Sequence, residues 1–241
     1  MAEIRVSVVN ESKAVTDGEV AKAIAALQKQ VSNDFSSAWG VDATLAQVAK
    51  GQTPPEGSWW LIILDNSDQA GALGYHDLTS EGLPLGKVFA GTDKQFGYKW
   101  TVTASHELLE MLADPDINLT VFAQKTAKNG SLFAYEVCDA CEDDAFGYDI
   151  DGITVSDFVF PAWFESFRTG DVQFDQQRQI HKPFDLLEGG YIGEFDVASG
   201  TGWHQVTAKG TPPSFQLRPR LGSRRERRRT PRDHWLRSNP K

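Results

Sequence analysis

The chain has 241 residues, 40% of them hydrophobic and 24% charged, which is an ordinary composition for a globular protein with one substantial core. No run of about 18 apolar residues occurs, and the first residues, MAEIRVSVVNES, lack the basic and then apolar order of a secretion signal. We therefore expect a cytoplasmic protein without a membrane span. The formal net charge of −9 disfavours nucleic acid as a partner of the main body.

The N-terminal part predicts a strand followed by one long helix. Residues 4–9 alternate apolar and polar, which is typical of a strand. Thr16 or Asp17 can cap a helix that begins near Gly18, and Gly40 fits its end. Apolar residues recur along this helix at spacings of three and four, and so predict one buried face. They are Val20, Ile24, Leu27, Val31 and Phe35.

The middle of the chain predicts further strands and a second helix. Residues 42–49 alternate weakly, whereas residues 58–65 are apolar on both faces and are expected in the centre of a sheet. Short strands are predicted around 72–77 and 86–90, the first of them an irregular edge strand. A helix is predicted over residues 100–113, and a proline shortly beyond stops it.

The last part of the body reads as strands and loops. Asp151–Gly152 predicts a hairpin turn. The segments read as strands and loops are FAYEVCDA, YDIDGITVSDFVFPAWF, GGYIGEFDV and WHQVTA. The predicted fold class is α+β: a twisted mixed sheet, an amphipathic N-terminal helix and the second helix beneath it, then a strand- and loop-rich C-terminal part.

The C-terminal end has a different composition. We expect a folded domain over 1–210 and an Arg- and Pro-rich tail over 211–241, disordered unless a partner orders it. From Arg218 to Lys241 there are ten basic and two acidic residues, a charge of +8, so the rest of the chain carries −17. Such a tail can bind an acidic protein surface or, less favoured because no nucleic-acid fold accompanies it, nucleic acid.

The segment TASHELLEMLADPD, residues 103–116, is the main functional candidate. His106 and Glu110 are four residues apart and therefore lie on one helix face, where both can bind one cation. Glu107 lies between them in the sequence. The opposing interpretation is an amphipathic helix with a polar edge, but charges on a packed helix cost desolvation energy unless they are paired or bound to metal.

His106-Glu107-Leu108-Leu109-Glu110 resembles the H-E-x-x-H motif of zincin metallopeptidases, with glutamate in place of the second histidine. The predicted element order is also similar to the N-terminal half of that fold. The resemblance implies zinc held by His106 and Glu110, and Glu107 as the general base of peptide hydrolysis. In short metzincins the third ligand stands ten residues after the first, which is Asp116 here, with Asp114 as a competitor. Two departures are Ala113, where that family has glycine, and the lack of a matching methionine turn.

Two further groups of residues are candidates around this helix. The segment YEVCDACEDD gathers acids that repel one another unless a cation intervenes. It therefore predicts a solvated acidic loop, a calcium site, or a third ligand from Glu136 or Asp139 to the helix. The acids proposed for it are Glu136, Asp139, Glu142 and Asp143. His76, on the expected edge strand, is interpreted as a surface histidine, with a role in a substrate cleft or as a ligand as the alternatives.

The only cysteines, Cys138 and Cys141, are too few for a four-cysteine zinc site. They predict a local disulfide or a pair of buried thiols, with metal ligation as a minor alternative.

The sequence leaves three functions open, and one further resemblance bears on them. SHELLEMLADP, YEVCDACEDD and DGITVSDFVFPAWF together resemble a group of uncharacterised bacterial and phage proteins. The favoured function is metal-dependent peptide hydrolysis, with a peptide or protein substrate. The alternative is a non-catalytic, zincin-derived structural protein, for example in a phage particle, that docks through its basic tail and is located in the virion. The third is a nucleic-acid-binding module that depends on residues 218–241.

Overall fold

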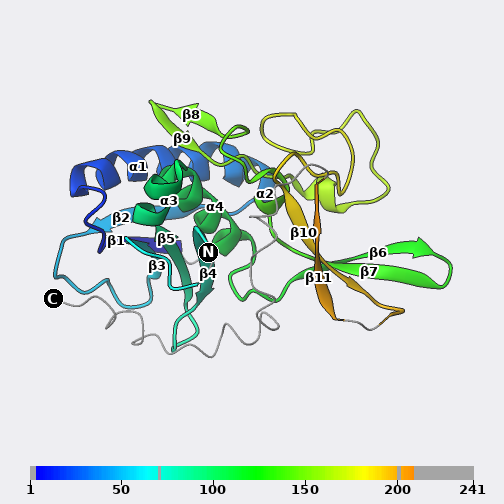
Figure 1. Ribbon diagram of the computed structural model, residues 1–241, viewed down its shortest axis with the longest axis horizontal. Coiled ribbons are helices and arrows are strands. Elements are labelled where there is room, and N and C mark those ends of the chain that lie inside the picture. Colours follow the sequence, from blue (N-terminus) through cyan, green and yellow to red (C-terminus); the bar gives the residue numbers. More distant parts are fainter. Residues whose placement is uncertain (1–3, 70–71, 200–201, 209–241) are drawn as a thin grey trace.

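The computed structural model describes residues 4–69, 72–199 and 202–208. A five-stranded sheet with helices on one face lies beside a four-stranded antiparallel sheet, as Figure 1 shows. This arrangement confirms the predicted α+β class with a mixed sheet. The predicted domain boundary at residue 210 and the basic tail over 211–241 lie outside the described residues.

The five-stranded sheet has the order β2-β1-β3-β5-β4, in which β2 and β4 are the edge strands and β4 is antiparallel to its neighbour, whereas the other four strands are parallel to one another. The apolar stretch that predicted a central strand forms β3, which lies in the middle of the order, as expected. The strands are β1 (Ile4–Asn10), β2 (Ala43–Val48), β3 (Trp59–Leu64), β4 (Gly74–Leu78) and β5 (Pro84–Phe89).

The predicted long helix is formed by three consecutive helical segments. They are α1 (Asp17–Lys29), the π-helix η1 (Gln30–Phe35) and α2 (Ser36–Trp39). Thr16 caps α1 and exchanges hydrogen bonds with Glu19 in a capping box. Gly40 ends the segment in the left-handed conformation, with a φ of 70°. The predicted apolar stripe is confirmed, because four of its five members are buried and Ile24 is half-buried.

The main core lies between the helices and one face of the sheet. Val6 and Val8 of β1 and Leu61 and Ile63 of β3 point into it because alternate residues of a strand share a face. On the opposite face Trp60, with its neighbours Ile62 and Leu85, forms a smaller cluster. Both α1 and α4 (Trp100–Ala113) cover the larger cluster (Figure 1).

Helix α4 confirms the predicted second helix and is buried on almost every side. It follows α3 (Ala90–Phe96), a short helix that the sequence pattern did not indicate. The hydrogen bond from the backbone N–H of Lys99 to Asp144 satisfies one free donor at the start of α4. No helix in the described part of the chain is both long enough and apolar enough to cross a membrane.

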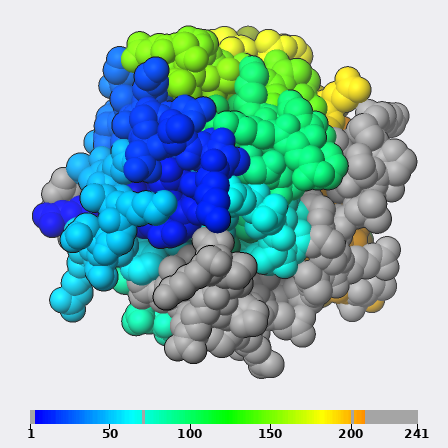
Figure 2. Space-filling model, turned by 60° about the vertical axis from the view of Figure 1, so that its left-hand side comes forward, coloured from blue at the N-terminus to red at the C-terminus, as the bar shows by residue number. Residues whose placement is uncertain are grey.

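The second sheet has the order β11-β10-β7-β6, and a separate hairpin, β8–β9, packs against α1. Asp151 and Gly152 form the predicted hairpin turn, with φ of 55° and 82°. Figure 2 shows the hairpin above the N-terminal helix, where Lys29 pairs with Asp151. The strands are β6 (Thr120–Thr126), β7 (Asn129–Ala134), β8 (Tyr148–Ile150), β9 (Ile153–Val155), β10 (Tyr191–Asp196) and β11 (Trp203–Thr207).

The predicted mixture of strand and loop in the last part of the body is confirmed. Within FAYEVCDA strand β7 ends at Ala134, and Asp139–Cys141 form a 3-10 turn. The chain leaves the sheet there because it turns towards α4, where the backbone N–H of Cys138 donates to Glu110. After the hairpin turn strand β9 stops at Val155, and Pro161–Phe164 form another 3-10 turn.

Candidate metal centre

Helix α4 carries its apolar and polar residues on different faces. Leu108, Leu109 and Leu112 enter the main core. His106, Glu107 and Glu110 face β4 and the loop after β7, where they are only 5%, 3% and 3% exposed. The predicted pairing of positions four apart is confirmed, because Nε2 of His106 lies 3.2 Å from Oε1 of Glu110.

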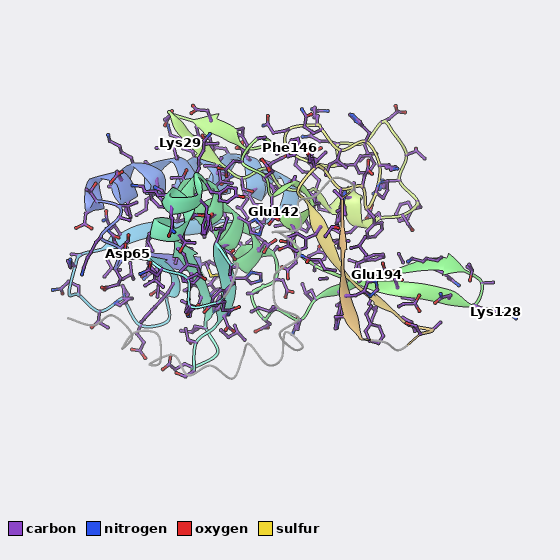
Figure 3. All side chains as sticks on the ribbon, viewed as in Figure 1. Lys29, Asp65, Lys128, Glu142, Phe146 and Glu194 are labelled. Carbon is purple, nitrogen blue, oxygen red and sulfur yellow. The ribbon has the colours of Figure 1, made fainter. Side chains whose placement is uncertain are left out.

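The loop after β7 brings an acid to this face. Oδ1 of Asp139 lies 3.3 Å from Nε2 of His106. His106, Asp139 and Glu142 each offer a ligand atom within 4.8 Å of the others. Three interpretations were offered for the acidic segment. The positions of Asp139 and Glu142 near His106 agree with the one in which an acid of this segment serves as a third ligand beside the helix residues. Figure 3 shows Glu142 where α4 approaches the C-terminal sheet.

The edge strand supplies a second histidine, so the interpretation of His76 as a surface residue was wrong. His76 is 4% exposed. Its Nδ1 lies 3.5 Å from Glu107 and 3.4 Å from Glu110, and its Nε2 lies 3.6 Å from Oε2 of Glu136. His76, Glu110 and Glu136 form another set with ligand atoms within 4.8 Å of one another.

These separations are longer than those of ideal charge-assisted hydrogen bonds and close to those between two ligands of one metal ion. Charge-assisted hydrogen bonds between nitrogen and carboxylate oxygen are about 2.7–2.9 Å long, whereas the contacts here span 3.2 to 3.6 Å. Two ligand atoms bound tetrahedrally to one zinc ion at about 2.0–2.1 Å are about 3.3 Å apart. The 3.2 and 3.3 Å separations of Nε2 of His106 from Glu110 and Asp139 are therefore those expected of ligand atoms on one ion.

Histidine and carboxylate compensate one another in this buried cluster. Burial alone would lower the pKa of His76, but Glu107 and Glu110 raise it to about 9. The pKa of His106 is raised well above its ordinary value, because Glu110 and Asp139 outweigh the opposite effect of burial. Burial would raise the pKa of Glu110, yet the two histidines hold it well below its usual range. The histidines and the carboxylates therefore stabilise one another's charged forms.

Asp114 and Asp116, proposed from the metzincin spacing, are not brought into this cluster. The Asp114 carboxylate accepts the backbone N–H groups of Asn118 and Leu119, both at 3.0 Å, and so closes the turn after α4. Asp116 is exposed. Neither aspartate belongs to the three ligand sets found among the described residues. The third acid comes from a distant loop because α4 ends immediately before these two residues.

A small cavity adjoins the polar face of α4. Its volume is about 60 Å³, and its lining includes His106, Glu107, Tyr98 and Thr103. Glu142, Asp143 and Asp144 line it from the loop after β7. Asp143 thus lies at the cavity rather than in one of the three ligand sets, and its Oδ1 accepts the N–H of Ala145. A space of this size admits water molecules.

Both cysteines are buried free thiols, so the expectation of a buried thiol pair is confirmed rather than that of a disulfide. Cys138 lies near His106 and Glu110 and forms the third set of ligand atoms with them. Burial, together with Glu110 and Asp139, raises the pKa of the Cys138 thiol. Because metals bind the thiolate, this makes Cys138 a weaker candidate ligand than Asp139.

Residues that carried no recognisable sequence signal hold α4 in place. Gln30, in the π-helix, accepts a 2.6 Å hydrogen bond from Ser105 and donates a 2.9 Å bond to the carbonyl of Ser156. On the opposite side, a Cβ at Gly74 would lie 2.7 Å from both Glu107 and Thr103, so only glycine allows β4 to approach this closely. Neither feature could have been recognised as important from the sequence, because the role of each depends on distant residues that it contacts only in the folded chain.

Comparisons with known proteins identify no relative: no family model, no curated protein and no solved structure matches this chain.

Proposed function

We propose that the cluster around His106 binds a divalent metal ion, with zinc as the first candidate, and that the protein uses it to hydrolyse peptide bonds. One observation carries the proposal. Nε2 of His106 lies 3.2 Å from Glu110 and 3.3 Å from Asp139, with all three side chains buried.

The residues fit zinc by their chemistry as well as their spacing. Zinc accepts histidine nitrogen and carboxylate oxygen in sites of three protein ligands plus one open position. Calcium takes six to eight oxygen ligands, so a site built on histidine favours zinc over calcium. His106 would hold the ion together with Glu110 and Asp139, whose carboxylate oxygens lie 3.2 and 3.3 Å from its Nε2. Glu142 is an alternative ligand, because it forms a set of ligand atoms with His106 and Asp139.

A metal ion bound there would act as a Lewis acid on a carbonyl group and lower the pKa of water. Glu107 supplies the acid–base chemistry because it lines the cavity beside His106. Its carboxylate would accept a proton from the attacking water and return it to the leaving amine. Gly74 of β4 lies directly against this carboxylate, where a larger residue would collide with it.

A zincin-like fold belongs to the same proposal. The order of elements that suggested the resemblance is present, with an antiparallel edge strand, β4, alongside the motif helix. His76 lies on that strand and contacts both glutamates of the motif. These features support the proposal. The site differs from that of metzincins in two ways: Glu110 stands where the motif has its second histidine, and Asp139 takes the role of the third ligand.

A non-catalytic role is the second candidate, and the burial of the cluster favours it. His106 is 5% exposed and the adjoining cavity has about 60 Å³, which holds water but not a peptide. In that case the ion would stabilise a structural protein, for example in a phage particle. The exposed aromatic residues Phe122 and Trp203 of the second sheet, 55% and 42% exposed, are suited to contacts in an assembly. The basic tail and its proposed protein or nucleic-acid partners lie outside the described residues.

The test combines metal content with hydrolysis. The full chain is purified without chelators or a metal-binding tag, loaded with zinc, and its metal is quantified by elemental mass spectrometry. Hydrolysis of fluorescein-labelled casein is then measured for wild type, Glu107→Gln and Glu110→Gln. The control is Glu188→Gln, which changes an exposed glutamate outside the cluster.

The hydrolase proposal expects bound zinc in wild type and zinc-dependent release of fluorescent peptide. Glu107→Gln should keep the metal and lose the release, whereas Glu110→Gln should lose metal. Zinc that is bound stoichiometrically without any release would overturn the hydrolase and favour the structural role. Wild-type protein without zinc would overturn both uses of the site.

A further inference from the structure

His76 has a feature that the proposed function does not use. It is 4% exposed, and its Nε2 has no hydrogen-bond partner within the described chain. The carboxylate oxygen Oε2 of Glu136 lies 3.6 Å from that nitrogen, beyond hydrogen-bond length. A buried polar atom without a partner is unfavourable, so this position calls for an additional group.

The surroundings of the ring indicate what that group is. Nδ1 faces two carboxylates, Glu107 at 3.5 Å and Glu110 at 3.4 Å. Glu107 alone suffices as the partner of a proton on this nitrogen, which leaves Oε2 of Glu110 available to a metal ion. The lone pair of neutral histidine is then on Nε2, the side of Glu136. Histidines that bind metal commonly carry their second N–H next to a carboxylate in this manner.

Glu110 connects this position to the first one. Its Oε1 faces His106 at 3.2 Å, and its Oε2 faces His76 at 3.4 Å. His76, Glu110 and Glu136 each offer an atom within 4.8 Å of the others. Glu110 thus lies between two histidines, and each histidine has a second carboxylate beside it, Asp139 at His106 and Glu136 at His76. Pairs of metal ions in proteins share a bridging carboxylate in such an arrangement.

We propose that a second divalent cation binds to His76, Glu110 and Glu136, so that Glu110 bridges two metal ions. The proposal rests on the proposed metal at His106, Glu110 and Asp139. Five carboxylates and two histidines contribute to the cluster, and one divalent ion would offset only two of the five negative charges. Two ions would offset four, which reduces the repulsion between carboxylates.

Two ions would extend the chemistry of the site. Paired ions about 3.5–4 Å apart act together on the attacking and leaving atoms of a hydrolysed bond. Glu107 contacts the other ring nitrogen of His76, Nδ1, and so would orient the histidine rather than bind the second ion. The competing explanation is a proton on Nε2 of His76, which would form an ion pair with Glu136 and need no second metal.

Metal stoichiometry separates these explanations. Metal-free full-length protein is dialysed against a buffered excess of zinc, and bound zinc is counted per chain by elemental mass spectrometry. The variants are His76→Asn, Glu136→Gln and His106→Asn, each checked for folding by circular dichroism. The matched controls are His181→Asn and Glu188→Gln, which alter exposed residues of the same types.

We expect two zinc ions per wild-type chain and in both controls, and one in His76→Asn and in Glu136→Gln. One ion per wild-type chain that survives in those two variants and is lost in His106→Asn overturns the second site but leaves the proposed function in place. One ion that His76→Asn removes also overturns the pair. No bound zinc in wild type overturns the second site together with the first.

A spectroscopic measurement tests the bridge itself and does not depend on activity. Manganese(II) replaces zinc in the metal-free protein, and electron paramagnetic resonance is recorded at low temperature. Two ions that share Glu110 should give a spin-coupled spectrum, which His76→Asn converts into that of isolated manganese. A spectrum of isolated ions in wild type at full loading would contradict the bridge.

Discussion

Ser105 donates a 2.6 Å hydrogen bond to the side-chain oxygen of Gln30, which is 75 residues earlier in the chain. Ser105 directly precedes His106, and Gln30 belongs to the π-helical turn that interrupts the N-terminal helix. The backbone N–H of Ser156 in turn donates to Ser105 at 3.0 Å. The motif helix is thus tied to two distant segments on the side opposite the candidate metal centre.

Removal of this polar link should weaken the fold. Gln30→Leu leaves the hydroxyl of Ser105 and the carbonyl of Ser156 without their buried partner, a loss of about 1–3 kcal/mol. The melting temperature should fall by about 3 to 8 °C in differential scanning calorimetry. Gln124→Leu, at an exposed position of β6, is the control and should melt within about 1 °C of wild type. A Gln30→Leu protein as stable as the control would contradict this role.

Because β4 lies so close to α4, the addition of one methyl group at Gly74 should lower the free energy of unfolding. In Gly74→Ala the new Cβ would meet Glu107 and Thr103 at 2.7 Å, and overpacking of this kind costs about 1–3 kcal/mol. Urea denaturation should show a lower midpoint with an unchanged slope. Gly170→Ala has no atom within 4 Å of its added Cβ and serves as the control. Equal midpoints for the two variants would show that β4 and α4 separate without cost.

Metal should stabilise the folded chain if the centre binds it. Zinc at about 100 times its dissociation constant adds about 2.7 kcal/mol to the free energy of unfolding. The melting temperature of metal-free protein should therefore rise by about 5 to 10 °C on addition of zinc, and a chelator should reverse the rise. Glu110→Gln should abolish most of it because Glu110 contacts both histidines. A rise of the same size in that variant would place the bound zinc elsewhere.

Two buried aspartates predict a pH-dependent stability outside the metal cluster. Burial, and then the neighbouring carboxylate of Asp175, raise the pKa of Asp157 to about 9 from an ordinary 3.8. Between these values the folded state holds the proton more tightly than the unfolded state does. This group therefore lowers stability as pH rises from about 4 towards 9, by at most about 1.4 kcal/mol per pH unit.

Asp157→Asn mimics the protonated acid and should remove that dependence. The variant should melt at a higher temperature than wild type at pH 8, and the difference should shrink as pH falls towards 5. Asp171→Asn, an exposed aspartate of the same irregular segment, is the matched control for the change in net charge. A difference between Asp157→Asn and wild type that stays constant over this range would show that no proton is held between Asp157 and Asp175.

The cysteines give a simple chemical test of the loop near the centre. Cys138 and Cys141 are free and buried, so a thiol reagent such as Ellman's reagent should react slowly with native protein. Two thiols per chain should react at once after denaturation without reductant. An absence of reactive thiols in the denatured protein would mean that the pair is oxidised.

Local sequence patterns determined the regular elements well. The stripe of Val20, Leu27 and Phe35 predicted a helix, and the capping residue Thr16 and the terminating Gly40 predicted its ends. The apolar run 58–65 predicted the central strand. These elements follow from side-chain periodicity and terminal hydrogen bonds, which involve residues only a few positions apart. The π-helical turn and α3 were not predicted because tertiary contacts, not local spacing, hold them.

The same distinction applies to the candidate centre. The pairing of His106 with Glu110 was determined by the sequence alone, because residues four apart on a helix always share a face. Only the tertiary structure decided that Asp139 completes this pair, that Asp116 remains at the surface, and that His76 reaches Glu110 from the edge strand. The physical reason is that these contacts join segments about 30 residues apart, whose meeting depends on sheet order and on how the core packs rather than on local spacing.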